Sequence, residues 1–266
     1  MEAPVGPPLA ATSSARLRGV PLPLLTGIAV AWLVALAAEA SGAASPLHHD
    51  ALIEDGPALS VAMPAFLVAW QLMIAAMMLP SSLPLVRLFA AASARQPRSR
   101  GAMTGLLGGY ALVWSVFGAL AFMLDLGVHA AVDANRSLHE YEWLLGGSVL
   151  VLAGVFQFTK LKDACLDKCR HPGAFMLRFY ERGIRGGFRL GARHGAFCVG
   201  CCWALMLVMF AAGVASLLWM AALTAVMVHE KTRPQGARTV PVTGVALLAA
   251  GSTTLLYSAW AAGALG

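Results

Sequence analysis

Long stretches without any charged residue alternate with short charged segments along almost the whole chain. Six such stretches lie between successive charges, and most of them exceed 18 residues. Because about 20 apolar residues cross the hydrocarbon core of a bilayer as a helix, this pattern predicts an all-α polytopic membrane protein. The helices are expected at Leu22–Ala40, Met63–Leu79, Met103–Leu124, Leu144–Phe158 and Val240–Ala262.

Four prolines surround the second of these expected helices. Proline lacks a backbone N–H and disrupts a helix interior, so each of the four suits a helix end better. The pattern therefore places Pro57, Pro64, Pro80 and Pro84 at or near helix ends.

The stretch from Phe197 to Val228 is too long for one ordinary span. As a single helix its 32 residues would measure about 48 Å, whereas the hydrocarbon core is about 30 Å thick. Two arrangements remain open: one tilted helix that protrudes from the membrane, or two short helices that turn near Gly213–Ser216.

The basic residues distinguish these arrangements under the positive-inside rule, which concentrates Lys and Arg in cytoplasmic loops. With the N-terminus in the cytoplasm and two short helices, 18 of the 19 basic residues fall inside. A single helix lowers that number to 15. The rule therefore favours two helices, about six to seven spans in total, a cytoplasmic segment Lys231–Arg238 and a C-terminus outside.

The Pro-, Ala- and Ser-rich residues 1–21 are expected to form a disordered tail, and residues 22–266 a single integral membrane domain. A long basic loop, Lys160–Arg193, is expected on the cytoplasmic side. At the end of this loop, in the segment Tyr180–His194, arginines recur every three or four residues. That spacing predicts a basic amphipathic helix on the anionic inner leaflet.

Composition supports a membrane protein and excludes an ordinary soluble enzyme. Hydrophobic residues make up 59% of the chain and charged residues only 12%, whereas soluble proteins carry about 25% charged residues. The net charge of +6 is explained by orientation in a bilayer, so nucleic acid is not expected as a partner. The sequence contains no phosphate-binding, dinucleotide-binding or hydrolase motif, and no enzymatic activity is predicted from it.

The five cysteines form two groups beside the expected membrane boundary. Cys165 and Cys169 lie in the basic loop, and Cys198, Cys201 and Cys202 open the next helix. On the cytoplasmic side thiols stay reduced, so structural disulfides are not expected. Thiolates are soft ligands that bind Cu(I), and also Zn(II) and iron–sulfur clusters. The pattern therefore predicts a transition-metal site, with Cu(I) favoured.

Helical spacing indicates which side chains would share this site. Residues four apart lie on one helix face, which favours Cys165, Cys169, Cys198 and Cys202 as ligands and turns Cys201 away. His194, four residues before Cys198, and Met206, four after Cys202, extend the same face. Two alternatives remain: thiol redox chemistry, and simple packing of cysteine and methionine in a core. The full candidate set is Cys165, Cys169, Cys198, Cys201, Cys202, His194 and Met206.

Three sequence motifs stand out: Trp70-x2-Met73-x2-Ala76-Met77-Met78-x-Pro80, Cys165-x3-Cys169-Arg170 and Gly195-x2-Cys198-x-Gly200-Cys201-Cys202-Trp203. Together they resemble a bacterial family described as predicted metal-binding integral membrane proteins. The resemblance covers about Ala62 to Lys231 and implies metal binding by the cysteine motifs in the bacterial inner membrane. Two positions depart from the family pattern: Lys160 replaces an expected proline, and Ala215-Ser216 replaces a usual Met-Asn.

Two classes of function follow from these observations. The first is metal transport, delivery or homeostasis, with a metal ion, the anionic inner leaflet and another membrane protein or metallochaperone as partners. The second is an accessory or redox subunit of a membrane oxidoreductase, whose cysteines hold a cluster or cycle as thiols. A third hypothesis is a membrane scaffold without a site.

Overall fold

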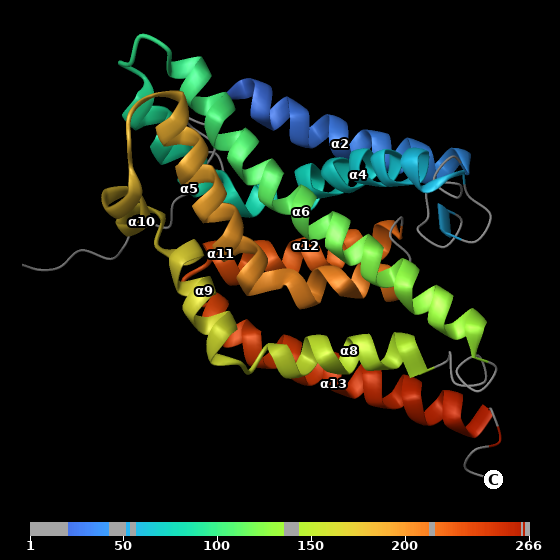
Figure 1. Ribbon diagram of the computed structural model, residues 1–266. Helices are drawn as coiled ribbons and strands as arrows, with labels where there is room; N and C mark the ends of the chain where they lie inside the picture. The colour runs from blue at the N-terminus through green and yellow to red at the C-terminus, as the bar shows by residue number, and fades with distance from the viewer. Residues whose placement is uncertain are drawn as a thin grey trace, which may run out of the picture.

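The computed structural model describes residues 21–42, 52–53, 57–135, 144–212, 216–261 and 263. The described residues form helices and no strands, which confirms the all-α prediction (Figure 1). Residues 1–20 of the expected tail lie outside this part of the chain. The main helices are α2 (Leu22–Ser41), α4 (Leu59–Met77), α5 (Leu79–Ser93), α6 (Ser99–Ala134), α8 (Leu144–Phe156), α9 (Lys160–Arg170), α10 (Pro172–Phe179), α11 (Gly183–Ala212), α12 (Leu217–Thr232) and α13 (Gly236–Ala261).

Five of the described helices are long and apolar enough to cross a membrane: α2, α4, α6, α11 and α13. A sixth span arises if α8 and α9, which meet at a 67° bend, are taken together. Six spans match the lower end of the predicted number. The seventh predicted span corresponds to α12, which has 16 residues and is shorter than the roughly 18 expected for an independent span.

Two of the four prolines occupy helix interiors, so the prediction that all of them stand near helix ends was wrong. Pro64 lies inside α4 and Pro84 inside α5. Helices packed in membranes tolerate interior proline because neighbouring groups satisfy the freed backbone carbonyls. The chain does break nearby, at Met78, and Pro80 stands in the first turn of α5, where its missing N–H has no helical partner to lose.

The 197–228 stretch forms two helices, as the distribution of basic residues predicted. α11 ends at Ala212 and α12 begins at Leu217, while residues 213–215 of the expected turn lie outside the described residues. Lys231, at the end of α12, returns to Cys198 of α11, with 3.1 Å between Nζ and Sγ. α12 therefore runs back antiparallel to the second half of α11.

The basic segment Tyr180–His194 does not form a separate surface helix, which corrects the sequence prediction. From Gly183 onward it is the first half of α11, continuous with the part that carries three cysteines. Glycines explain why this half packs instead of lying on the surface. A Cβ atom at Gly187 would collide with the backbone oxygen of Ala102 in α6, and one at Gly191 with that of Leu106. Small residues of this kind let membrane helices approach closely.

The buried side chains form two cores. The first, which we call the sulfur core, contains all five cysteines and seven methionines, contributed chiefly by α4, α9, α11 and α12. The second core lies between α2, α5, α6, α10 and α11 and contains one methionine, Met176. The basic segments α9 and the start of α11 lie with α10 at one end of the bundle, on the left in Figure 1.

Candidate metal centre

Helices α9 and α11 bring the two groups of cysteines into one core. α9 begins at the N-cap Thr159, whose side chain accepts a hydrogen bond from the backbone N–H of Lys162. Its buried face carries Cys165 and Cys169. All five cysteines are free thiols and all are buried. The predicted convergence of residues 165–169 with residues 198–202 is therefore present in the fold.

One pair of thiols, Cys169 and Cys201, joins the two helices, with 3.9 Å between the Sγ atoms. Cys201 was predicted to face away from the other cysteines, and this prediction was wrong. Residues three apart on a helix are neighbours as well as residues four apart, so Cys201 stays on the side of Cys198. α9 packs on that side, because Gly200 leaves room for the Sγ atom of Cys165, which would stand 2.6 Å from a Cβ there.

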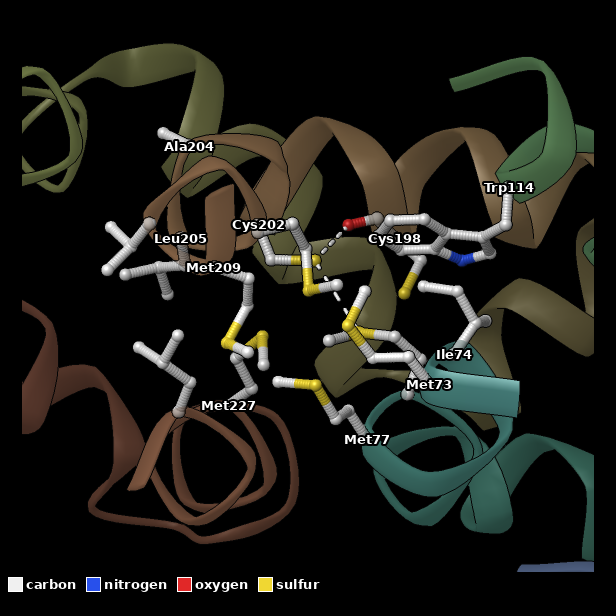
Figure 2. Packing of buried hydrophobic residues seen from close by; sticks show 14 of the residues in the cluster. Met73, Ile74, Met77, Trp114, Cys198, Cys202, Ala204, Leu205, Met209 and Met227 are labelled. Carbon is white, nitrogen blue, oxygen red and sulfur yellow. Dashed lines mark hydrogen bonds between the residues drawn. The ribbon is translucent and has the colours of Figure 1, made fainter. Parts of the chain in front are cut away.

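The thiols of α11 also bond to their own helix. The Sγ atom of Cys202 donates to the backbone oxygen of Cys198 at 2.7 Å, and that of Cys201 donates to the same oxygen at 3.2 Å. Cys202 additionally lies 3.9 Å from the Sδ atom of Met78, at the break between α4 and α5. Figure 2 shows Cys198 and Cys202 beside a group of methionine side chains.

A buried ammonium group stands among the thiols. The Nζ atom of Lys231 lies 3.1 Å from Cys198 Sγ and 3.8 Å from Cys202 Sγ, and it donates to Ser81 Oγ at 3.3 Å. Lys231 was not among the site residues predicted from the sequence. The sequence signal that could have indicated it is the charged pair Glu230-Lys231 at the end of a long charge-free stretch, where the predicted pair of short helices ends.

A second lysine ties α9 to α12 through a buried ion pair. Lys162 is fully buried, and its Nζ atom lies 2.7 Å from Oε2 of Glu230. Arg170, at the end of α9, donates to the backbone oxygens of Glu230, Arg233 and Pro234. These bonds satisfy carbonyls at the end of α12, which lack helical partners. Together they fix the position of Cys165 and Cys169 against α11.

His194 lies on α11 one turn before Cys198, and its ring nitrogen bonds to a serine. Its Nε2 atom lies 3.2 Å from Ser82 Oγ, and its ring stacks on Tyr110. The Tyr110 hydroxyl in turn lies 3.1 Å from Cys198 Sγ and accepts a hydrogen bond from Ser82. His194 is therefore linked to Cys198 through these two side chains. Met206 is fully buried in the sulfur core.

Within the part of the chain that the structure describes, no group of three or more His, Cys, Asp or Glu side chains is arranged to hold a metal ion. Instead, the Cys169 thiol lies beside the Cys201 thiol, and the Cys198 and Cys202 thiols lie beside the ammonium group of Lys231. Residues 67–254 match a family named PpoB2 and described as copper chaperone. The chain belongs to this copper chaperone family. It matches no curated protein and no solved structure.

The part of the chain that matches the copper chaperone family contains every residue of the candidate centre. It begins within α4 and ends within α13, so α2 lies outside it. All five cysteines, His194 and Met206 lie inside, together with Lys162, Glu230 and Lys231. Membership of this family agrees with the metal-related function that the cysteine motifs predicted, and it directs that function to copper.

Proposed function

We propose that this protein is a membrane-embedded copper chaperone that holds Cu(I) on its buried cysteines and passes it to another protein. The observation that carries the proposal is the pair Cys169 and Cys201, whose sulfur atoms face each other at 3.9 Å between α9 and α11. These two thiols come from different helices, so an ion bound between them would join the two cysteine motifs.

The distance between the two sulfurs suits one ion. A metal–thiolate bond is about 2.3 Å long, so an ion between two thiolates holds the sulfurs at most about 4.6 Å apart. The pair therefore needs to open only slightly. Cu(I) is soft and accepts two or three sulfur ligands, whereas structural zinc is held by four, so this pair favours copper. Of the other cysteines, Cys165 packs at Gly200, next to Cys201, and the backbone oxygen of Cys198 accepts a hydrogen bond from the Cys201 thiol.

The charges around the thiols also support Cu(I). Two thiolates and one Cu(I) ion carry a net charge of −1, which is costly to bury without a counter-charge. Lys231 supplies one positive charge beside Cys198 and Cys202. The other buried lysine, Lys162, is already paired with Glu230. Among the described residues of the site, Lys231 is therefore the lysine whose positive charge is available for an anionic copper complex.

We propose that the end of the bundle with α9, α10 and the start of α11 faces the cytoplasm, with the N-terminus on that side. The basic residues of this end support the orientation under the positive-inside rule, and they suit an anionic leaflet. An impermeant maleimide applied to intact cells tests it. We expect no labelling of Gln235→Cys, between α12 and α13, and labelling of Asn135→Cys, at the far end of α6. Labelling of Gln235→Cys from outside would overturn this orientation.

Anaerobic titration with Cu(I) and a competing chelator tests the copper site. We expect the purified protein to bind copper tightly, and the double variant Cys169→Ser/Cys201→Ser to lose that binding. Ala204→Ser is the matched control, because it places a hydroxyl at a buried position of α11 without removing a sulfur. If the double variant keeps the copper content and affinity of the wild type, the cysteines are packing residues and the proposal is wrong.

The same facing pair favours a second candidate function, an accessory or redox subunit of a membrane oxidoreductase. Two thiols at this distance can cycle between reduced and disulfide forms, or share in holding a cluster. Visible absorption distinguishes the candidates, since an iron–sulfur cluster is coloured and a Cu(I)–thiolate complex is not. Alkylation followed by mass analysis reports whether Cys169 and Cys201 become oxidised during purification from the membrane.

A further inference from the structure

Three methionines from three different helices meet deeper in the sulfur core. Met77 belongs to α4, Met209 to α11 and Met227 to α12. All three are fully buried, with 0% of each side chain exposed. Figure 2 shows the three side chains pointing toward one another in the space between their helices. Three thioether sulfurs from separate elements are thereby directed at one place.

This group of methionines adjoins the cysteines. Cys202 lies 3.9 Å from the sulfur of Met78, the residue that follows Met77. Cys202 and Met209 are seven residues apart on α11 and share one helix face, with about 10 Å between them along the axis. Met227 lies one turn of α12 before Lys231, which contacts Cys198. The three thioethers therefore lie next to the thiols, about two helical turns further along α11.

We propose that Met77, Met209 and Met227 form a second Cu(I) site, distinct from the cysteine site on which the proposed function rests. Thioethers are soft and uncharged, so they suit Cu(I) or Ag(I) and do not suit Zn(II). They bind without losing protons, whereas thiols must be deprotonated first. Movement of an ion between the sites is ligand exchange at constant oxidation state: copper–thiolate bonds break and copper–thioether bonds form. The ion thus gains a position deeper in the protein than Cys202.

Selenomethionine provides a direct probe of the thioether site. Protein labelled in this way is loaded anaerobically with increasing Cu(I) and measured by X-ray absorption at the selenium edge. We expect copper–selenium scattering to appear as the second ion binds. The triple variant Met77→Leu/Met209→Leu/Met227→Leu should lose this scattering while keeping the copper bound to cysteines. Leucine has nearly the volume of methionine, so the variant is expected to fold, which gel filtration checks.

Met176→Leu is the matched control, because Met176 is buried in the second core, away from the cysteines. It should leave both the copper content and the copper–selenium scattering unchanged. Cys169→Ser/Cys201→Ser should lose the cysteine-bound copper and retain copper–selenium scattering at high copper concentration.

Each alternative outcome affects one proposal. Wild-type protein that binds copper through thiolates without any copper–selenium scattering would overturn the thioether site and leave the cysteine site standing. Scattering that persists in the triple variant would overturn the assignment to these three methionines. Scattering that remains in a cysteine variant with wild-type copper content would overturn the proposed function and support the thioether site.

Discussion

The two buried cores of this protein have different compositions although three helices, α2, α6 and α11, contribute to both. α6 contributes Leu106 to the second core and Tyr110 to the sulfur core, one turn apart. α11 contributes Leu190 to the second core and Cys198 to the sulfur core. Among the described residues, the second core is filled by Leu, Val, Phe, Ala and one Met. General packing in a membrane helix therefore does not require sulfur here.

The buried charged side chains are also unevenly distributed between the two cores. Lys162, Glu230 and Lys231 are all buried at the sulfur core. Burying a charge costs free energy even when it is paired, and a protein optimised for stability alone has little reason to keep three of them together. Departures from simple packing rules of this kind concentrate at functional sites. The second core is therefore composed for packing, whereas the sulfur core also contains the buried thiols and charges on which the proposed copper site depends.

The largest effect should come from breaking the buried ion pair of the sulfur core. Lys162→Met leaves Glu230 buried without its partner, which typically costs about 3–5 kcal/mol. We expect a correspondingly lower stability, measured by thermal unfolding in detergent micelles. Because Lys162 fixes α9 against α12, copper binding at Cys169 should fall as well.

The double variant Lys162→Met/Glu230→Met is the control for this prediction. It removes both charges, and replacing a buried pair with apolar groups is often neutral. Most of the lost stability should return. If the single variant is as stable as the wild type, the ion pair does not hold α9 in place.

Lys231 should affect copper more than stability. Replacing it with methionine removes the positive charge beside Cys198 and Cys202 and leaves the copper complex without compensation. Partners in the outer shell of a metal site typically change affinity by about 10- to 100-fold. We expect a loss in that range in an anaerobic chelator competition. Lys231→Arg, which keeps the charge, should recover part of the affinity, and equal affinities for both variants would contradict the charge argument.

The sequence predicted the helices well because each is specified locally. Charge-free stretches near 22, 144 and 240 became α2, α8 and α13 with ends shifted by a few residues. The convergence of the cysteines was also predictable, since both groups flank the same expected membrane boundary. The basic residues further indicated the break between α11 and α12, because only two helices return Lys231 to the side of Cys198.

The partners of the cysteines were not predictable in the same way. Lys162 and Glu230 are 68 positions apart, and Tyr110 and Cys198 are 88 apart. No local pattern connects such positions. Whether Cys201 faces the other cysteines depends on the side of α11 against which α9 packs. Gly200 permits the observed packing because it has no Cβ atom to collide with Cys165. The interior positions of Pro64 and Pro84 are likewise tolerated because of neighbouring helices. The rule that proline stands at helix ends considers only the local chain and therefore could not predict them.

A smaller effect is expected at the contact that joins the two cores. Gly109 of α6 lies between Leu106 and Tyr110, and a Cβ there would collide with the backbone oxygen of Phe188 in α11. Gly109→Ala should therefore destabilise the protein by about 1–3 kcal/mol through overpacking. Gly108→Ala is the control, because nothing lies within 4 Å of a Cβ at Gly108. It should be neutral or stabilising, and equal melting temperatures for the two variants would contradict the close helix contact.

The smallest effect should come from removing single hydroxyl groups, one beside each core. Tyr110→Phe removes the hydroxyl that lies 3.1 Å from Cys198 Sγ. A hydrogen bond of this kind contributes about 0.5–1.5 kcal/mol, so copper affinity should fall by no more than about tenfold. Tyr180→Phe removes a hydroxyl beside the second core that bonds to Ala92 and Gln96. It should lower the melting temperature and leave copper affinity unchanged. If both variants change copper affinity equally, the second core affects copper binding as much as the sulfur core does, and the proposed functional difference between the two cores is wrong.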